Sequence, residues 1–125
     1  MSIRVIHIPI DPAARHQVVE ISENETSEKI HELVDGSFQC IELNDDVFVW
    51  VNEEGKLQGL PWNQRAQVLW DERYGRGTDF LVGSAVLTGG TDARGETLGL
   101  SDHQIATVER KLRPFAAAPI HRRPI

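Results

Sequence analysis

The chain has 125 residues, of which 40% are hydrophobic and 26% charged, with a net charge of −6 and a single cysteine. A chain of this length fits one domain that buries roughly two-thirds of its unfolded surface, and one cysteine excludes an internal disulfide. No apolar run approaches the roughly 20 residues of a membrane-spanning helix, and Pro9 interrupts the N-terminal apolar stretch too early for a secretory signal. We therefore expect a cytoplasmic, single-domain protein.

The charge is unevenly distributed along the chain. Residues 1–60 hold 12 acidic and 4 basic residues, whereas residues 61–125 hold 7 acidic and 9 basic residues. Between Glu20 and Glu54 there are 11 carboxylates and one basic residue, Lys29. Such a stretch repels phosphate backbones and attracts basic protein surfaces, so nucleic acid is an unfavourable partner. The alternative interpretation is a solvated face that keeps a small protein in solution.

The N-terminal part predicts a β-hairpin followed by a helix. Ile3–Ile10 and His16–Ile21 are rich in β-branched residues, and the intervening DPAAR has the composition of a turn. Ser27–Asp35 has apolar residues at helical spacing. The expected end signals of this helix are an N-cap at Asn24 or Thr26 and Gly36 at the C′ position.

A second hairpin is expected in the middle of the chain. Phe38–Leu43 and Val47–Val51 read as strands, and the residues between them, Asn44, Asp45 and Asp46, read as a tight turn. The second strand is apolar on both faces, which predicts an inner position in the sheet. Gly55 is then expected to supply a positive φ angle in the following turn.

The C-terminal half predicts two helices around one more strand. Asn63 has the pattern of an N-cap for a helix to about Trp70, and Ser101 with Gln104 forms a capping box for a last helix that ends at Pro114. Between them we expect a loop (73–78), a strand (79–87) and a mobile, glycine-rich loop (88–99). The predicted fold class is therefore α+β, with a mixed or antiparallel sheet of about five strands and two to three short helices. Residues 1–113 are expected to form this single domain, and residues 114–125 an extended Pro/Arg-containing tail.

The chain lacks the common catalytic signatures. There is no G-x-S-x-G elbow, no H-E-x-x-H zinc motif and no lysine-bearing phosphate loop, and the five histidines show no metal-ligand spacing. Cys40 lies in a predicted strand and is expected to be buried and inert. We therefore assign no catalytic residue, no metal and no cofactor. An enzyme using Asp79 or the glutamates is the least favoured interpretation, because no base–nucleophile pair is visible.

One stretch, residues 52–65 (NEEGKLQGLPWNQR), gathers polar and aromatic side chains. An aromatic face beside an arginine and two amides could hold a nucleobase by stacking and hydrogen bonding. The structural alternative assigns these residues to turns, a helix cap and the core, and it explains more of them. The candidate ligand-binding residues are Asn52, Glu54, Trp62, Asn63 and Arg65.

The same stretch carries a family resemblance. VNEEGKLQGLPWNQRA (51–66), then DFLVGSAVL (79–87) and a closing LSDHQI (100–105), resembles a small phage- and plasmid-borne family known only as a domain of unknown function. The match could span residues 3–112, while loops 73–77 and 88–99 and the tail depart from the family pattern. The resemblance implies a mobile-element origin and, by association, a role in host takeover or counter-defence. It implies no reaction and no catalytic residue.

Two functions follow from these observations. The first is a phage or mobile-element accessory protein that binds a host or defence-system protein with a basic surface, without catalysis, in the host cytoplasm. Its candidate acidic face comprises Glu23, Glu28, Glu32, Asp45 and Asp46. The second is a protein that binds or sequesters a nucleotide through the residues of the 52–65 stretch, and a homo-oligomer with a shared site is compatible with it.

Overall fold

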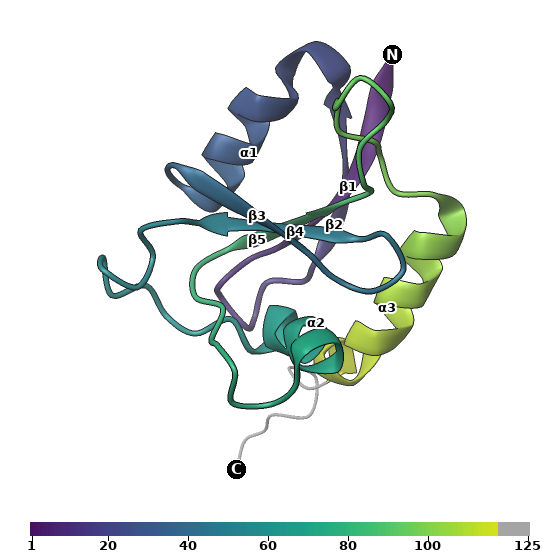
Figure 1. Cartoon of the computed structure of the whole chain (residues 1–125). Coiled ribbons are helices and arrows are strands. Elements are labelled where there is room, and N and C mark those ends of the chain that lie inside the picture. Colours follow the sequence, from purple (N-terminus) through teal and green to yellow (C-terminus); the bar gives the residue numbers. More distant parts are fainter. Residues whose placement is uncertain (118–125) are drawn as a thin grey trace.

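The computed structural model describes residues 1–117, and in them the chain forms a five-stranded antiparallel sheet with three α-helices (Figure 1). The strand order is β2-β1-β5-β4-β3, and every neighbouring pair is antiparallel. This confirms the predicted α+β class. The strands are β1 (Ser2–Ile8), β2 (Gln17–Ser22), β3 (Phe38–Glu42), β4 (Phe48–Asn52) and β5 (Ala85–Thr88).

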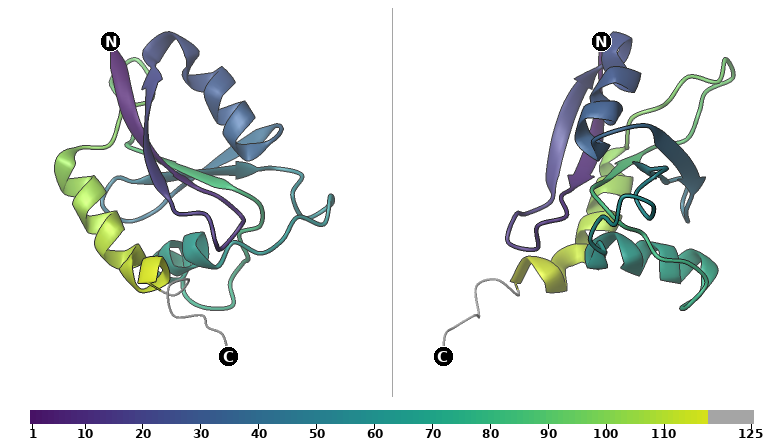
Figure 2. Two further views of the ribbon diagram at one scale, coloured as in Figure 1. Left: turned by 180° about the vertical axis from the view of Figure 1, so that it is seen from behind. Right: turned by 90° about the vertical axis from the view of Figure 1, so that its left-hand side faces the viewer.

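Helices cover both faces of the sheet (Figure 2). Helix α1 (Thr26–Val34), preceded by the 3₁₀ turn η1 (Glu23–Glu25), packs on one face, and α2 (Gln64–Tyr74) and α3 (Asp102–Ala117) pack on the other. Because side chains alternate along a strand, Val5 of β1 faces α1 while Ile6 faces α2 and α3. The sheet therefore separates two apolar clusters, and β5 is buried along its whole length at the centre.

The ends of α1 differ from the prediction. Neither Asn24 nor Thr26 caps the helix; its N-cap is Glu25, which makes no side-chain cap bond. At the other end Asp35, not Gly36, takes the left-handed conformation, with φ of 64°. Gly36 has another role, because a Cβ there would lie 2.8 Å from Nδ2 of Asn52. The glycine makes room for that amide.

The N-terminal signals of α2 and α3 are confirmed. The Asn63 side chain accepts a hydrogen bond from the amide of Ala66 at 3.1 Å. Ser101 and Gln104 exchange side-chain and backbone bonds at 2.9 and 3.1 Å, which is the predicted capping box. The prediction that α3 ends at Pro114 is wrong: the backbone remains helical through Pro114 to residue 117. The rest of the predicted tail, residues 118–125, lies outside the described residues.

Two further predictions are corrected around β5. The expected strand over residues 79–87 is only Ala85–Thr88, because Asn63 N donates to Leu81 O and Gly83 N donates to Pro61 O. These bonds turn residues 81–83 toward the segment before α2 instead of toward β4. Gly55 does not have a positive φ angle; a Cβ there would meet Cγ2 of Val82 at 2.9 Å.

Cys40 was expected to be buried, but it is exposed on β3, at the edge of the sheet. Its Cα partner on β4 is Trp50, and the outer side of β3 has no strand beside it in the described part of the chain. Partial desolvation against the sheet raises the pKa of the thiol to about 11. The raised pKa keeps the thiol protonated at neutral pH, which makes it a poor nucleophile even though the residue is not buried.

Candidate functional site

Asn52 lies at the end of β4 and is buried. Its Nδ2 donates to the carbonyls of Val34 and Asp35 at 3.4 and 3.1 Å, and its Oδ1 accepts from the amide of Glu54 at 2.8 Å. The side chain therefore joins the C-terminal end of α1 to the turn after β4. Its donors and its acceptor are both used inside the protein.

Asn63 is also buried, at the N-terminus of α2. While its Oδ1 caps the helix, its Nδ2 donates to the carbonyls of Ile8 and Gly83 at 3.1 and 2.9 Å. One amide thus links α2 to the end of β1 and to the segment that enters β5. Satisfied buried amides of this kind hold separate elements in register.

Arg65 is 7% exposed and lies in the first turn of α2. Its guanidinium donates to the carbonyls of Pro9, Asp11 and Ala14 at 2.6, 3.0 and 2.6 Å. It thereby orders the connection between β1 and β2. Burial lowers the pKa of this guanidinium, and the nearby Asp11 carboxylate opposes that shift.

The remaining two candidates of the 52–65 stretch lie at the surface. Glu54 is exposed, and Trp62 is 49% exposed, not in the core as the structural alternative assumed. The indole Nε1 of Trp62 donates to Gln67 Oε1 at 2.9 Å, and its ring meets Phe80 edge-on at 6.3 Å between centroids. The five candidates therefore face different parts of the molecule and do not converge on one point.

The acidic residues also fall into two groups. Glu23, Glu25, Glu28 and Glu32 are exposed on η1 and α1, and we call this set the acidic helix. Lys29 is the basic residue within it and pairs with Glu32 at 3.6 Å. The buried side of the same helix, Ile30 and Val34, packs on the sheet, so the carboxylates face outward.

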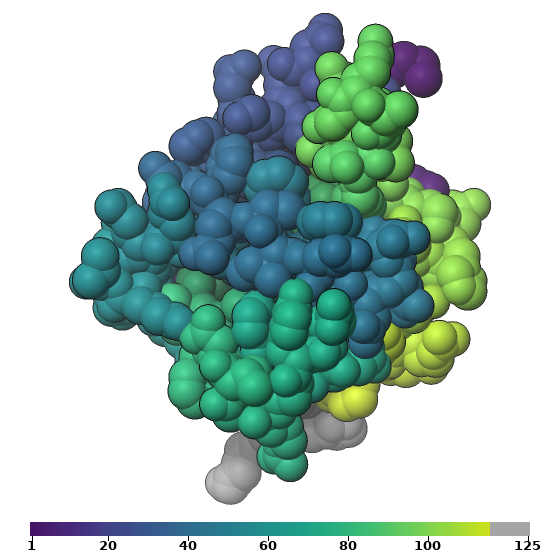
Figure 3. Space-filling view, in the orientation of Figure 1, coloured from purple at the N-terminus to yellow at the C-terminus, as the bar shows by residue number. Residues whose placement is uncertain are grey.

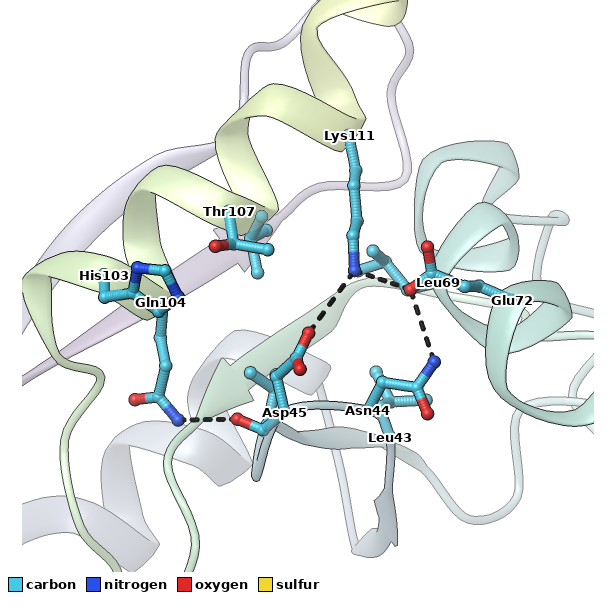
Figure 4. A pocket seen from close by; sticks show the side chains of 11 residues that line it. Leu43, Asn44, Asp45, Leu69, Glu72, His103, Gln104, Thr107 and Lys111 are labelled. Atoms are coloured by element: carbon cyan, nitrogen blue, oxygen red, sulfur yellow. Dashed lines mark hydrogen bonds and ion pairs between the residues drawn. The ribbon is translucent and has the colours of Figure 1, made fainter.

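Asp45 and Asp46 belong to a different surface. Both have positive φ angles, 62° and 58°, in the turn between β3 and β4, and their carbonyls accept from Nε2 of Gln104 on α3. Figure 4 shows the bond from Gln104 to Asp45. The carboxylate of Asp45 faces Lys111, whose Nζ lies 3.8 Å from it and 2.5 Å from Glu72. The predicted acidic face is thus divided, and Asp45 is partly neutralised by α3.

Figure 4 shows that this second cluster is internally paired. Asn44 and Lys111 both donate to the Glu72 carboxylate, and the bond from Lys111 is the main reason that the pKa of Glu72 is held below its ordinary value. The small hollow between them has a volume of about 20 Å³, enough for a water molecule or so. This cluster joins the β3–β4 turn to α2 and α3.

A groove that the sequence did not reveal lies between α1 and the loop of residues 88–99. Its volume is about 520 Å³, in the range of ligand pockets. Figures 1 and 2 show α1 and the loop at the same end of the sheet, and Figure 3 shows the loop beside α1 on the same face. No local sequence pattern indicates this groove, because the order of the strands brings Phe38 and Trp50 together with the loop.

Comparison with known proteins identifies the family. The family model described as "Domain of unknown function (DUF3846)" matches residues 3–113. The chain belongs to this family. Neither the comparison with curated proteins nor that with solved structures gave a match. The DUF3846 match contains the sheet from residue 3 onward and all of the candidate residues, which confirms the resemblance to a domain of unknown function.

Within residues 1–117, no group of three or more histidine, cysteine, aspartate or glutamate side chains is placed to hold a metal ion. None of the helices in that range is long and apolar enough to cross a membrane.

Proposed function

We propose that this protein is a non-enzymatic binding protein whose acidic helix engages the basic surface of a partner protein. The observation that carries the proposal is the exposed row of carboxylates on η1 and α1, with Lys29 as its basic residue. Among the described residues, Glu23, Glu25 and Glu28 make no salt bridge, so their carboxylates are available to pair with another surface. They also increase the rate of encounter with a positively charged partner.

The acidic helix is held rigidly enough to serve as a recognition surface. Ile30 and Val34 are each 1% exposed and lock the helix onto β1, β2 and β5 through the second apolar cluster. Asn52 fixes the C-terminal end of the helix through two carbonyls. A partner therefore meets a preformed charge pattern, and little ordering entropy is lost on this side.

The partner that we propose is a host or defence-system protein in the bacterial cytoplasm. The phage and plasmid context implied by the family resemblance supports this choice, since small proteins of mobile elements act on the machinery of their host. The division of the acidic residues narrows the surface involved. The proposal uses Glu23, Glu28 and Glu32, which share η1 and α1, and not Asp45 and Asp46, which lie in the β3–β4 turn beside α3.

The nucleotide hypothesis gains no support from the geometry of residues 52–65. The amide and guanidinium donors of Asn52, Asn63 and Arg65 are taken up by main-chain carbonyls. Trp62 presents an exposed ring, but the polar groups that would read a base beside it face inward. The geometry of residues 52–65 therefore does not favour a nucleotide-binding function.

A pull-down with matched charge-reversal variants tests the proposal. The tagged protein is used as bait in a bacterial lysate at low and high salt, and retained proteins are quantified by mass spectrometry. We compare E28K/E32K, on the acidic helix, with E53K/E54K, on the exposed turn after β4, because both change the net charge by the same amount. The wild type and E53K/E54K should retain the same partner at low salt, and E28K/E32K should lose it.

The control results decide the outcome. Retention should fall as salt rises, because exposed charges separated by more than about 8–10 Å are screened at physiological ionic strength. Circular dichroism of both variants confirms that α1 is intact. Equal retention by E28K/E32K and the wild type, or equal loss in both variants, would show that the acidic helix is not the recognition surface.

A further inference from the structure

The groove between α1 and loop 88–99 has an apolar floor. Phe38 and Trp50, from β3 and β4, are partly exposed in it, while Ile3 and Ile30, from β1 and α1, line it as buried residues that are 8% and 1% exposed. Leu98, on the loop side, is 45% exposed. Phe38 and Trp50 meet edge-to-face with 5.0 Å between ring centroids. This floor is an apolar surface that α1 covers only in part.

Hydrogen bonds within the protein fix Trp50 in the floor of the groove and the loop that forms one of its walls. Trp50 is fixed by a hydrogen bond of 2.9 Å from its Nε1 to Thr88 Oγ1. The loop, predicted from its glycines to be mobile, is closed by hydrogen bonds within itself. Gly89 and Leu98 are paired through Gly89 N to Leu98 O at 3.0 Å, and Oδ1 of Asp92 accepts from the amides of Arg94 and Glu96. An occupant would not have to order this loop, which lowers the cost of binding.

The rim of the groove is predominantly acidic. Glu23 lies on the α1 side and Asp92 and Glu96 on the loop side, while Arg94 is the basic residue among the described residues that line it. The two hydrogen bonds that Asp92 accepts from loop amides keep its pKa below its ordinary value, so it is ionised at neutral pH. An apolar floor between carboxylates matches a chain that carries both apolar and cationic side chains.

We propose that this groove takes a short segment of the partner protein in which a large apolar side chain is flanked by lysine or arginine. The apolar side chain would cover Trp50, Phe38 and Leu98, and the flanking cations would meet Glu23 and Glu96. This inference rests on the proposed function and adds the chemistry of the partner. The acidic helix attracts the basic surface, and the groove selects a particular segment of it.

Peptide selection tests this proposal with a defined probe. Random peptides displayed on phage are selected against the wild-type protein and counter-selected against S27W, a variant that places an indole at the exposed α1 wall of the groove. S37W is the matched control, because Ser37 is exposed in the link between α1 and β3 and does not line the groove. Selected peptides are then synthesised with a fluorophore and titrated by anisotropy.

The expected peptides combine an aromatic or aliphatic residue with neighbouring lysine or arginine. Their affinity should fall at least about tenfold in S27W, equivalent to about 1.4 kcal/mol, and should not change in S37W. L98S is a second variant that removes floor area without filling the groove, and it should weaken the same peptides. Urea unfolding of each variant separates loss of binding from loss of folding.

Several results would overturn the inference: no enrichment over the counter-selection, selected peptides without basic residues, or equal affinity for the wild type and S27W. The outcome is also separable from that of the proposed function, since Glu28 and Glu32 do not line the groove. Partner capture lost in E28K/E32K but kept in S27W would reject the groove alone. Peptide binding sensitive to S27W, with partner capture kept in E28K/E32K, would reject the acidic helix.

Discussion

Replacing Asn63 by alanine should remove a large part of the folding free energy, although the position resembles a ligand-binding residue in sequence. The side chain is 1% exposed and makes three hydrogen bonds, one from the amide of Ala66 and two to the carbonyls of Ile8 and Gly83. Loss of an N-cap costs about 1 kcal/mol. Each buried carbonyl that loses its donor adds about 1–3 kcal/mol.

We therefore expect N63A to destabilise the protein by about 3–7 kcal/mol, against a total of about 5–15 kcal/mol for a domain. Two further variants divide this cost. N63S keeps an oxygen acceptor for the cap and should recover about 1 kcal/mol relative to N63A. N63D keeps the cap acceptor but sets a carboxylate oxygen against the two carbonyls.

The sign of the N63D effect depends on pH. A buried carboxyl that faces two carbonyl oxygens has a raised pKa in the folded state, so N63D should gain stability as pH falls. Urea unfolding followed by tryptophan fluorescence measures all three variants, with the slope compared to confirm two-state unfolding. A cost below about 1 kcal/mol for N63A would refute the reasoning, because one cap alone accounts for that much.

Three other measurements check the same structure. R65K should destabilise the protein by about 1–3 kcal/mol, because one ammonium cannot replace a guanidinium that donates to the carbonyls of Pro9, Asp11 and Ala14. Proteolysis within residues 9–15 should increase in this variant, and unchanged proteolysis would contradict the role of Arg65 in ordering this connection. Burial lowers the pKa of His7 below 6.5 in the folded state, so the free energy of unfolding should decline as pH falls from 7.5 through 6.5, and H7Q should flatten that part of a plot of urea midpoint against pH. H7Q should keep the further loss of stability below pH 4.5, because hydrogen bonds from lysines lower the pKa values of Glu72 and Asp79 in the fold. G99A should cost about 1–3 kcal/mol by overpacking, because its Cβ would lie 2.8 Å from that of Ile3 and 2.9 Å from the amide of Arg4; a thermal midpoint equal to that of the wild type would refute this contact.

The N-terminal signals of two helices were predictable from sequence, whereas the long-range features of the fold were not. The cap at Asn63 and the capping box at Ser101 depend on residues three positions apart, and both were predicted correctly. Arg65 donates to carbonyls more than 50 residues earlier in the chain, a role that no local pattern encodes. The central place of β5 has the same origin, since both of its neighbours are distant in sequence.

The candidate surfaces show the same limit. Glu23 and Asp46 belong to one acidic stretch in the sequence, yet the hairpin that ends in Asp46 carries it to α3 while Glu23 stays beside α1. The groove unites α1 with a loop more than 60 residues later, so its lining could not be read from either segment. The negative charge was predictable as a property of composition, but its division between two surfaces depends on strand order.

Glu32 provides a direct test of whether the acidic helix is kept for binding. It lies in the last turns of α1, where the helix dipole favours a cation, and it stands four residues after Glu28, which places two like charges together. E32K would replace that repulsion with an ion pair between Glu28 and the introduced ammonium, in the favourable order, and would lose the 3.6 Å pair with Lys29. The new ammonium would also repel Lys29, three residues earlier, by about as much as the pair with Glu28 gains, so the helix dipole decides the sign. We expect a net stabilisation of about 0.3–1 kcal/mol.

If the carboxylate serves only solubility, E32K should cost nothing in binding. If the carboxylate serves recognition, E32K should be more stable than the wild type and yet retain less partner at low salt. Residues that serve function often lower the stability of a protein in this way. Urea midpoints and the pull-down, measured on the same preparation, give both quantities. A variant that is less stable than the wild type would show that Glu32 has a structural role, and a stabilised variant with undiminished retention would remove it from the recognition surface.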